Sequence, residues 1–564
     1  MAQIENPSCQ REILATNPKC SSCNWFSPET GIYISKHRSR QLPSNPFLDV
    51  VSFIFSHSHK GVSALIDSSS GFSISYSKLQ QMVKSMGSGL HEIGVSQGEV
   101  VLILLPNTIY YPVVFLGVLS IGAIATSMNP LSSPAEIKKR ISDCNVVLAF
   151  ATSGRVGEIE KMGVHVVEVR ENAASDSSWS EFSCFNKLLL SDPNSSHRAI
   201  INQKDTAAIL YSSGTSGVSK GVVLTHMNFI AMVELFVRFE ASQYESLASD
   251  NVYLATVPMF HVYGLSLFAM GLLSLGSAIV VMRKFDVDEM VRAIDRYKIT
   301  HLPVVSPILM ALARVKSSSD CSLRSLKQVS FGAAPTSKKI ILDFLQRFPQ
   351  VDLIQGYGMT ETAAVGTRGF NTEKIRKYTS IGLLAPNMQA KVVNWITGSC
   401  LPPGETGELW LRGPAIMKGY LNNAEATSST IDRDGWLHTG DIAHFDQDGY
   451  LYILDRLKEM IKYKGYQIAP ADLEAVLFSH PEILDVAVAA VIDEEAGELP
   501  VAFVVKRPGS ALSQADVIDY VAQQVAPYKK VRKVVFTSSI PKSAAGKILR
   551  RRLSNSISNL KSRI

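Results

Sequence analysis

Short apolar runs rich in β-branched residues recur through roughly residues 50 to 450 of the chain. Runs such as VVLILLP, VVLAFAT, AAILYSS, LATVPMF, AIVVMRK and HLPVVSP alternate with stretches of helical periodicity, for example DVDEMVRAIDRYK and SKKIILDFLQRF. Strands that are apolar on both faces and alternate with helices are typical of sheets covered by helices. The pattern therefore predicts a layered α/β architecture for this part of the chain.

The pattern of apolar and polar residues changes in the last third of the sequence. From about residue 400, GETGELWLRGPAIMKGY, DRDGWLHTGD and HFDQDGYLYIL read as short strands joined by turns rich in Gly and Asp. From about residue 456 to residue 564, the chain combines helical patterns (ADLEAVLFSH, QADVIDYVAQQV), strands (VAVAAVI, VAFVVK) and a basic tail. These patterns predict a β-rich annex to the first body, followed by a small α+β domain.

The composition is that of a protein with large buried cores. Of the 564 residues, 46% are hydrophobic and 19% charged, which is too apolar for a disordered chain. The 56 Lys and Arg against 50 Asp and Glu give a small excess of positive charge that is spread along the chain, so no nucleic-acid footprint follows. Residues 111–126 and 252–282 are apolar, but the first segment is too short and the second too interrupted to predict a membrane span.

The seven cysteines are scattered and odd in number, which favours a reducing compartment over a disulfide framework. Cys20 and Cys23 form a C-x-x-C pair, but no second pair at matching spacing completes a zinc site, so we interpret the spacing as chance. The opening residues have no apolar run of signal-peptide length, and we expect no secretion signal.

The strongest local signal for chemistry is AAILYSSGTSGVSKGVVLTH, at residues 207–226. An apolar strand leads into a loop of Ser, Thr and Gly that contains Lys220, and a second apolar stretch follows. Backbone N–H groups, hydroxyls and one ammonium in such a loop can surround a phosphate chain. The glycine spacing differs from G-x-x-x-x-G-K-[ST], which weakens a kinase or GTPase interpretation. A flexible Ser/Gly surface loop is the alternative.

Two further segments offer oxygen ligands. LIQGYGMTETAAV, at 353–365, places Thr360 next to Glu361, and a hydroxyl beside a carboxylate suits a magnesium–nucleotide complex. DGWLHTGDIAHF, at 434–445, places Asp441 in a turn between β segments, where its carboxylate can accept hydrogen bonds from ribose hydroxyls. Alone, the Thr-Glu pair means little and Asp441 reads as an ordinary turn residue.

Basic side chains gather in two segments near the end of the chain. LDRLKEMIKYKGYQIAP, at 454–470, marks the expected domain boundary, and its charges also fit a solvated face. SSIPKSAAGKILRRRL, at 538–553, has Lys542 and Lys547 before three arginines. A basic tail is one interpretation; a lysine delivered to a phosphate by a mobile domain is the other.

The order and combination of these segments resemble the adenylate-forming superfamily of acyl-CoA synthetases, luciferases and peptide-synthetase adenylation domains. The resemblance covers roughly residues 45–555, and the chain looks most similar to the plant 4-coumarate–CoA ligase and 4-coumarate–CoA ligase-like group. It rests on motifs that are specific as a set: YSSGTSGVSKGV, PMFHVYGL, SFGAAP, QGYGMTET, GELWLRGPAIMKGY, GWLHTGD, DRLKEMIKYKGYQIAP and PKSAAGKILRR.

The resemblance implies an α/β protein in several parts. After a polar N-terminal arm at 1–45, a large N-terminal domain of layered α/β sheets spans 46–454, and from about residue 385 it continues as a β-rich, barrel-like subdomain. A hinge at 455–458, with Lys458 as hinge residue, leads to a small mobile α+β domain at 459–564. The implied reaction joins a carboxylate to the α-phosphate of ATP, with Mg²⁺, and then transfers the acyl group to coenzyme A.

The same resemblance implies roles for individual residues. Tyr357 flanks the adenine, and Asp441 with Arg456 holds the ribose. The catalytic residues, of which the last two also bind Mg²⁺, are Lys547, Lys462, Gln467, His261, Thr360 and Glu361. The nucleotide- and cofactor-binding residues are Ser212, Ser213, Gly214, Thr215, Ser216, Gly217, Lys220, Gly332, Ala333, Ala334, Gln355, Gly356, Tyr357, Gly358, Asp441, Arg456, Lys464 and Gly465. The acyl pocket takes Val262, Tyr263, Ser266, Ser330 and Val365.

The chain departs from 4-coumarate ligases in this acyl pocket. Those enzymes have an Asn where Ser266 stands, a Lys where Ser330 stands, and Pro-Val-Leu where this chain has Ala364, Val365 and Gly366. Loss of the Asn and Lys removes partners for a phenolic hydroxyl, and smaller residues leave more apolar room. We therefore expect a cinnamate-type aromatic acid or a medium-to-long fatty or oxylipin acid, with a hydroxycinnamate as the alternative.

The acyl acceptor and the cellular compartment are open to more than one interpretation. A luciferase-like or carrier-loading enzyme shares the first half-reaction, and a catalytically silent homologue keeps only the fold. The last residues, Ser562-Arg563-Ile564, are similar to the peroxisomal address SKL, which predicts binding to a peroxisomal import receptor; a cytoplasmic location is the alternative.

Overall fold

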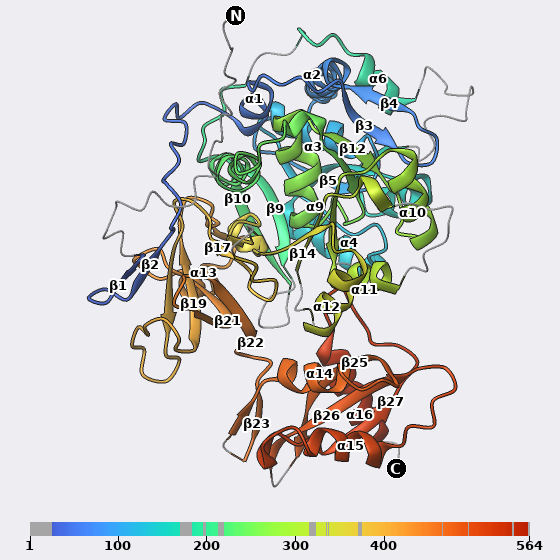
Figure 1. The fold of residues 1–564 in the computed structure, drawn as a ribbon. Coiled ribbons are helices and arrows are strands. Elements are labelled where there is room, and N and C mark those ends of the chain that lie inside the picture. The colour runs from blue at the N-terminus through green and yellow to red at the C-terminus, as the bar shows by residue number, and fades with distance from the viewer. Residues whose placement is uncertain are drawn as a thin grey trace, which may run out of the picture.

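Two large sheets, whose strands are mostly buried, form the framework of the large domain (Figure 1). The structure is a computed structural model that describes residues 25–169, 183–195, 199–212, 219–314, 323–333, 336, 338–369, 371, 375–464, 466–493, 496–543 and 546–561.

The first sheet has seven strands, and its inner strands are parallel. At one edge, an antiparallel hairpin carries the predicted phosphate loop. The order is β20 (Gly419–Tyr420), β10 (Lys220–Thr225), β9 (Thr206–Ser212), β6 (Ile124–Ser127), β5 (Val100–Leu104), β7 (Val146–Ala151) and β8 (His165–Glu168).

The second sheet has nine strands and the same plan of a parallel centre with antiparallel edges. Its strands β14 and β15 carry several of the residues that the sequence assigns to the nucleotide and acyl sites: Ser330, Gly332, Gln355, Gly356 and Tyr357. The order is β17 (Leu383–Leu384), β16 (Thr367–Arg368), β15 (Asp352–Tyr357), β14 (Gln328–Gly332), β13 (His301–Val305), β11 (Val252–Ala255), β12 (Ala278–Val281), β3 (Ser63–Asp67) and β4 (Ser73–Ser75).

Buried helices share one apolar core with strands of both sheets. These helical segments are α1 (Val50–Phe55), α2 (Tyr76–Glu92), α3 (Tyr111–Ser120), α7 (His226–Met232), η1 (Val233–Arg238), α9 (Val262–Gly264), η3 (Leu265–Gly271) and η4 (Leu272–Leu275). The apolar segment 111–126 is thus the buried helix α3 followed by β6, and 252–282 contains β11, the helices from α9 to η4, and β12. No helix among the described residues is long and apolar enough to cross a membrane.

Amphipathic helices cover the remaining faces. In α10 (Val287–Arg296), Asp286 caps the first turn, and Met290, Val291, Ala293 and Ile294 are buried, which is the spacing of one helix face. The other helical segments of the large domain are α4 (Pro134–Cys144), α5 (Ser153–Glu160), α6 (Cys184–Leu190), α8 (Phe239–Ala241), η2 (Ala248–Asp250), α11 (Ser306–Arg314), η5 (Leu323–Ser325), α12 (Lys338–Arg347) and η6 (Thr360–Thr362).

The β-rich part forms a six-stranded sheet that includes residues from the N-terminal arm. Its order is β1 (Phe26–Ser27), β2 (Ile32–Ile34), β18 (Gln389–Val393), β19 (Gly407–Arg412), β21 (Leu437–Phe445) and β22 (Leu451–Arg456), with α13 (Ala424–Thr430) between β20 and β21. Tyr33 is fully buried and stacks on Phe445 with ring centroids 4.2 Å apart. The structure therefore differs from the prediction of a polar arm for residues 26–34, because this segment completes an apolar sheet face.

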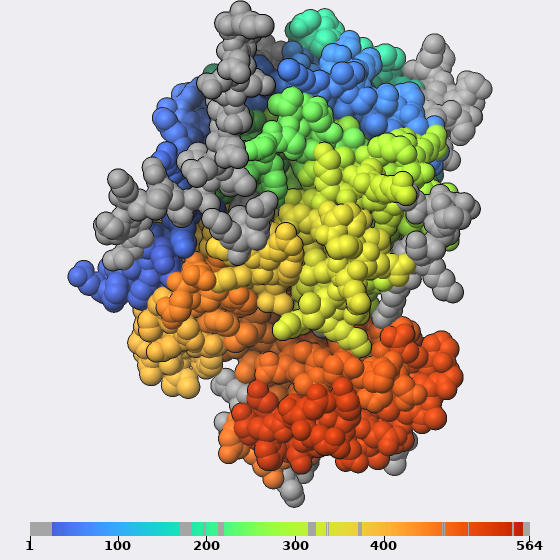
Figure 2. All heavy atoms as spheres, viewed as in Figure 1, coloured from blue at the N-terminus to red at the C-terminus, as the bar shows by residue number. Residues whose placement is uncertain are grey.

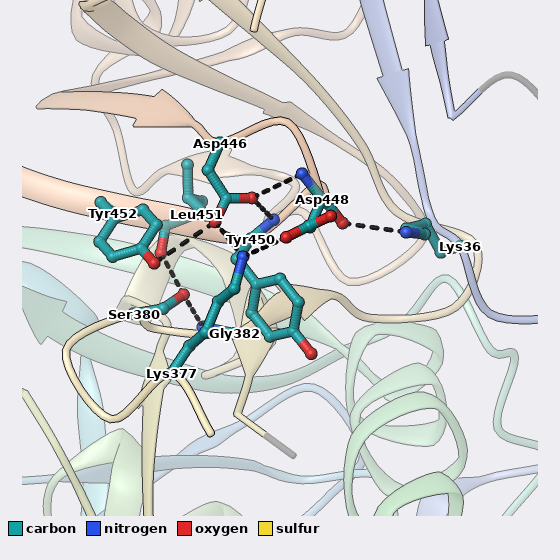
Figure 3. A network of polar contacts seen from close by, with 9 residues as sticks. All are labelled: Lys36, Lys377, Ser380, Gly382, Asp446, Asp448, Tyr450, Leu451 and Tyr452. Carbon is teal, nitrogen blue, oxygen red and sulfur yellow. Dashed lines mark hydrogen bonds and ion pairs between the residues drawn. The ribbon is translucent and has the colours of Figure 1, made fainter. Parts of the chain in front are cut away.

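A polar network holds the arm to the turn between β21 and β22 (Figure 3). The Lys377 ammonium lies 2.5 Å from Asp446 Oδ2 and 2.6 Å from Asp448 Oδ2. Lys36 Nζ donates to the Asp448 carbonyl oxygen at 2.9 Å. The network fixes the hairpin that carries Asp441 and Arg456 at its other end.

The C-terminal domain is a separate unit below the large body (Figures 1 and 2). Its sheet follows the order β24 (Tyr466–Ile468), β23 (Ile461–Tyr463), β26 (Gly497–Lys506) and β25 (Ile483–Asp493), with β27 (Lys533–Phe536) beside β26. Its helices are α14 (Pro470–Phe478), α15 (Gln514–Ala522), η7 (Pro527–Lys529) and α16 (Arg550–Lys561). Apolar clusters of its own fill this domain, so it has a core independent of the large domain.

Candidate active site

The hairpin of β9 and β10 brings the two ends of the predicted phosphate loop together. Ser212 lies opposite Lys220 in the register, and Ser219 Oγ donates to the Ser212 carbonyl oxygen at 3.0 Å. The predicted residues between them, Ser213, Gly214, Thr215, Ser216 and Gly217, lie outside the described residues.

Glu361 joins this hairpin to the end of β15. It lies in η6, is only 4% exposed, and accepts hydrogen bonds at Oε1 from Ser212 Oγ (2.8 Å) and from the Tyr420 hydroxyl (3.0 Å). Lys220 Nζ lies 4.7 Å from the centre of the Tyr420 ring, and Thr360 is buried beside Glu361. A buried carboxylate among hydroxyls is a set of hard oxygen donors, which fits Mg²⁺ shared with phosphate oxygens.

A second cluster gathers Tyr357, Asp441 and Arg456. The Tyr357 hydroxyl donates to Asp441 Oδ2 at 2.6 Å, and Arg456 Nε lies 3.0 Å from Asp441 Oδ1. Asp441 and Arg456 face each other across β21 and β22. The Asp441 charge raises the pKa of Arg456, and burial together with that carboxylate raises the pKa of Tyr357. Both carboxylate oxygens of Asp441 are therefore held in fixed positions by protein partners.

The ends of β14 and β15 approach each other at glycines. A Cβ added to Gly332 would lie 2.9 Å from the Gly356 carbonyl oxygen, so a side chain does not fit there. Ala333 follows with φ of 68°, and Gln355 and Tyr357 flank Gly356 in β15. Gly358 follows β15 directly, while the predicted Ala334 lies outside the described residues.

Lys547 comes to this cluster from the C-terminal domain. Burial lowers its pKa, the charge of Arg456 lowers it further, and Glu459 and Asp441 act in the opposite direction. The neighbouring Gly546, with φ of 77°, packs on the large domain: an added Cβ would lie 2.8 Å from Pro307 Cδ and 3.4 Å from Val305 Cβ. Close packing at this glycine positions the lysine loop against the end of β13.

The predicted hinge is a tight turn after β22. Glu459 N donates to the Arg456 carbonyl oxygen at 2.9 Å, and Leu457 N donates to the Gly440 carbonyl oxygen at 2.8 Å. Asp455 accepts from Arg456 N and Ala471 N, and burial raises its pKa to about 6. The turn, which contains Lys458, is therefore bonded on one side to β21 and on the other to the start of α14.

Arg550 ties this turn to the body of the C-terminal domain. Its Nε lies 2.8 Å from Glu459 Oε2, its Nη1 pairs with Glu474 on α14, and Nη1 also donates to the Val488 carbonyl oxygen at 2.9 Å. Because Arg550 is three residues after Lys547, the same ion pairs hold the lysine loop.

The residues predicted for the thioester step lie elsewhere. Lys462 and Lys464 are exposed in the hairpin of β23 and β24, where Lys462 N donates to Glu498 Oε2 at 2.7 Å. Gly465 lies outside the described residues, as does the side chain of Gln467, whose backbone pairs with Lys462. The structure thus brings Lys547 to the nucleotide cluster and leaves this hairpin away from it.

The predicted acyl-pocket residues come together between η3, β14 and the segment after η6. Ser266 Oγ donates to the Ala363 carbonyl oxygen at 3.4 Å, and the Tyr263 hydroxyl donates to the Ser330 carbonyl oxygen at 3.5 Å. Val262 and Val365 are buried. His261 Nδ1 accepts from Tyr263 N at 3.3 Å, and burial lowers the pKa of His261 to about 4. This imidazole is therefore neutral near pH 7 and supplies no positive charge.

The sequence interpretation missed two features of the site. Tyr420 links Lys220 to Glu361, although it belongs to a motif noted only for the family resemblance. Arg368 and Glu240 form a buried ion pair of 2.7 Å beside Ser330, where an apolar interior was expected. One signal was present: Arg368 is a charged residue two positions after Gly366 in an otherwise uncharged run.

Comparison with known proteins agrees with this architecture. The AMP-binding enzyme family matches residues 55–421, and the AMP-binding enzyme C-terminal domain matches residues 472–547. The chain is 59% identical over 551 residues to 4-coumarate–CoA ligase-like 6 of Arabidopsis thaliana, which covers 96% of this chain and 97% of the relative. It is 45% identical to peroxisomal OPC-8:0-CoA ligase 1 of the same plant, over 96% of this chain and 98% of the relative.

Solved structures show the same fold. ATP-bound MatB from Rhodopseudomonas palustris superposes with a TM-score of 0.81 at 23% identity, covering 91% of this chain and 99% of that one. The chain therefore belongs to the AMP-binding enzymes, the adenylate-forming superfamily, and within it to the 4-coumarate–CoA ligase-like group of acyl-CoA synthetases. It is an ATP-dependent, AMP-forming acid–thiol ligase that uses coenzyme A.

Proposed function

We propose that this ligase activates a hydrophobic carboxylic acid, either a cinnamate-type aromatic acid or a medium-to-long fatty or oxylipin acid. The substitutions at Ser266 and Ser330 support this proposal, since both remove polar partners for a phenolic ring. The similarity to a relative named peroxisomal OPC-8:0-CoA ligase 1 also supports this proposal.

One observation carries the proposed mechanism: the Lys547 loop of the C-terminal domain packs at Gly546 on Pro307 of the large domain, where the charges of Asp441 and Arg456 act on the pKa of Lys547. In the first half-reaction, a carboxylate oxygen attacks the α-phosphorus of ATP, and the bond to pyrophosphate breaks. Two anions meet in this step, so a fixed ammonium at the meeting point lowers the barrier. We assign this role to Lys547 and the ribose contacts to Asp441.

Glu361, a buried carboxylate among the hydroxyls of Ser212 and Tyr420, would hold Mg²⁺ in this proposal. When bound, the ion neutralises charge on the phosphate chain. Ser212, Lys220 and the loop between them hold the β- and γ-phosphates in this proposal.

In the second half-reaction, the thiol sulfur of coenzyme A attacks the acyl carbonyl carbon, loses its proton, and AMP leaves. The Lys547 loop, packed on Pro307 and Val305, occupies the side from which we expect the thiol to approach. A rotation at Lys458 withdraws the loop and brings the hairpin of Lys462, Lys464 and Gln467 to the site. The exposed position of that hairpin in this structure supports a second arrangement of the domains.

An assay of pyrophosphate release with a panel of acids, with and without coenzyme A, tests the proposal. We expect release with cinnamic and medium-to-long fatty acids, and thioester only when coenzyme A is present. A large kcat/KM preference for 4-coumarate or caffeate would show a hydroxycinnamate ligase instead. Pyrophosphate release without thioester formation would indicate a different acceptor, and no release with any acid would indicate a silent homologue.

We also propose that the protein is imported into peroxisomes through Ser562-Arg563-Ile564, which lies outside the described residues. The peroxisomal relative supports this location. A fluorescent fusion that keeps the C-terminus free should enter peroxisomes, and the same fusion without the last three residues should stay in the cytoplasm. Import that survives the deletion contradicts this address.

A further inference from the structure

A narrow cavity lies behind the acyl pocket, along strand β13 and away from Lys547. Its lining includes Ser330 and Pro303 at one end, and His301 and Asn251 at the other. The strand register pairs His301 with Gln328 and Val305 with Gly332. The Lys547 loop packs at Val305, so His301 lies four residues along the strand from that level. At the usual strand rise, the cavity extends from about 7 to about 13 Å beyond that level.

The lining of this cavity is unexpectedly polar. Arg368 pairs with Gly356 in the strand register. Its side chain lies over that glycine, because a Cβ added to Gly356 would be 3.4 Å from Arg368 Cδ. The guanidinium then donates from Nη2 to Glu240 Oε1 at 2.7 Å. Both side chains are nearly inaccessible, at 7% and 13% exposure, so the pair is buried.

Two buried atoms at this cavity have no hydrogen-bond partner within the part of the chain that the structure describes. They are Arg368 Nε, a donor, and Asn251 Oδ1, an acceptor. A buried donor or acceptor without a partner is destabilising, so an atom that bonds to it is favoured there. The cavity measures about 20 Å³, room for about one water-sized group, so a larger occupant must move side chains aside.

The charges of Arg368 and Glu240 indicate which chemical group can accept a hydrogen bond from Arg368 Nε. Glu240 raises the pKa of Arg368 above its usual value although burial acts against this, so the guanidinium stays charged and is already neutralised. Asp352 is already a second carboxylate whose charge acts on this pair. A substrate carboxylate would add a further uncompensated negative charge in a buried place, which is costly. A neutral carbonyl or hydroxyl oxygen can accept from Nε without adding charge.

We propose that Arg368, held by Glu240, is a specificity-determining residue that selects acids bearing a neutral oxygen atom remote from the carboxylate. This inference rests on the proposed function, because it places the acyl chain along β13 with its carboxylate near Lys547. Among the acids of the proposed function, it favours those with a remote oxygen atom, such as oxo or hydroxy acids, over unsubstituted fatty acids and cinnamate.

The test compares a saturated fatty acid with the oxo acid of equal length whose ketone lies next to the terminal methyl group. In the wild-type enzyme, we expect a kcat/KM for pyrophosphate release at least about tenfold higher for the oxo acid. The double variant Arg368→Met/Glu240→Leu removes both charges, so that neither is left unpaired. It should lower the oxo-to-saturated ratio by about tenfold or more.

Two further variants separate recognition from folding. Arg347→Met removes an exposed arginine on α12 and should keep the wild-type ratio. Arg368→Lys keeps the charge and should retain part of the preference if the double variant does not fold. The KM for ATP reports whether the nucleotide site is intact in each variant.

The outcomes separate this inference from the proposed function. Absence of pyrophosphate release with every acid overturns the proposed function itself. Release with an equal or higher kcat/KM for the saturated acid in the wild-type enzyme overturns the role of Arg368 and leaves the proposed function standing. A preference for the dicarboxylic acid of equal length also overturns it, because the charge argument would then be wrong.

Discussion

Lys547 lies where charges of both signs compete. Arg456 and Arg550 disfavour its ammonium form, as burial does, while Glu459 and Asp441 favour it. The lysine is therefore held in place by its loop and by the pairs of Arg550 rather than by an ion pair of its own. The Lys547 ammonium can therefore bind a further anion, as the reaction of ATP with a carboxylate requires.

At this scale, Lys547→Ala should lower the rate of pyrophosphate release by about 10²–10³-fold, because the site loses a preorganised positive charge. Transfer from a synthetic acyl-adenylate to coenzyme A should be much less affected. Lys542→Ala is the matched control: Lys542 lies on the same loop, but its ammonium pairs with Asp485 at 2.6 Å within the C-terminal domain. Equal losses in the two variants would contradict the assignment.

The pH dependence of adenylation should follow the same group. Burial and Arg456 lower the pKa of Lys547, and the charged form is needed, so activity should fall as pH rises through this lowered pKa. The fall should begin at a lower pH than a free lysine would give. Lys547→Arg, whose guanidinium stays protonated, should move the alkaline limb upward. An identical limb in both enzymes would assign it to another group.

At the scale of the element, the hairpin of β21 and β22 carries the residues predicted to bind the ribose and leads into the predicted hinge. Asp441 and Arg456 face each other across it, and the turn that contains Lys458 begins at Arg456. A change in the backbone at this turn therefore acts next to the Asp441–Arg456 pair without altering either side chain. At the other end of the hairpin, the ion pairs of Lys377 with Asp446 and Asp448 hold the turn between β21 and β22 in place.

Lys458→Pro should spare adenylation and slow thioester formation, because the ring fixes one backbone angle of the turn that must change during rotation. The two half-reactions are measured separately, by pyrophosphate release and by thioester formation from the acyl-adenylate. Lys458→Ala leaves the backbone free and serves as the control. Equal loss of both half-reactions in the proline variant would place the hinge elsewhere.

At the scale of the whole molecule, the two domains meet with the lysine loop inserted and the hairpin of Lys462 turned away (Figures 1 and 2). This arrangement suits the first half-reaction. Gly546 packs closely on Pro307 and Val305 of the large domain, so a side chain at this position would disturb the arrangement.

Gly546→Ala should slow pyrophosphate release, because the new Cβ meets Pro307 at 2.8 Å and φ is positive. Thioester formation from the acyl-adenylate should be affected less, the reverse of the hinge variant. Gly509→Ala is the matched control, since φ is 79° there but no atom lies within 4 Å of the added Cβ. Similar effects of the two substitutions would mean that backbone strain, and not docking, is responsible.

The sequence determined the elements and the family. DVDEMVRAIDRYK contains α10, SKKIILDFLQRF contains α12, and most of AAILYSS lies in β9, because apolar periodicity and caps act over a few residues. The fold class and the ligase activity are confirmed by the comparisons. The roles of the site residues stay predictions, and those on the phosphate loop concern residues outside the described part of the chain.

Only the tertiary structure decided which distant residues share an environment. The arm residue Tyr33 joins a sheet with Phe445, Glu361 binds both Ser212 and Tyr420, and Arg368 pairs with Glu240 in a place that the sequence suggested was apolar. Local patterns cannot specify such partners, because burial and charge compensation depend on which strands and helices pack together. The sequence therefore sets the chemistry that is available, and the packing decides which groups face one another.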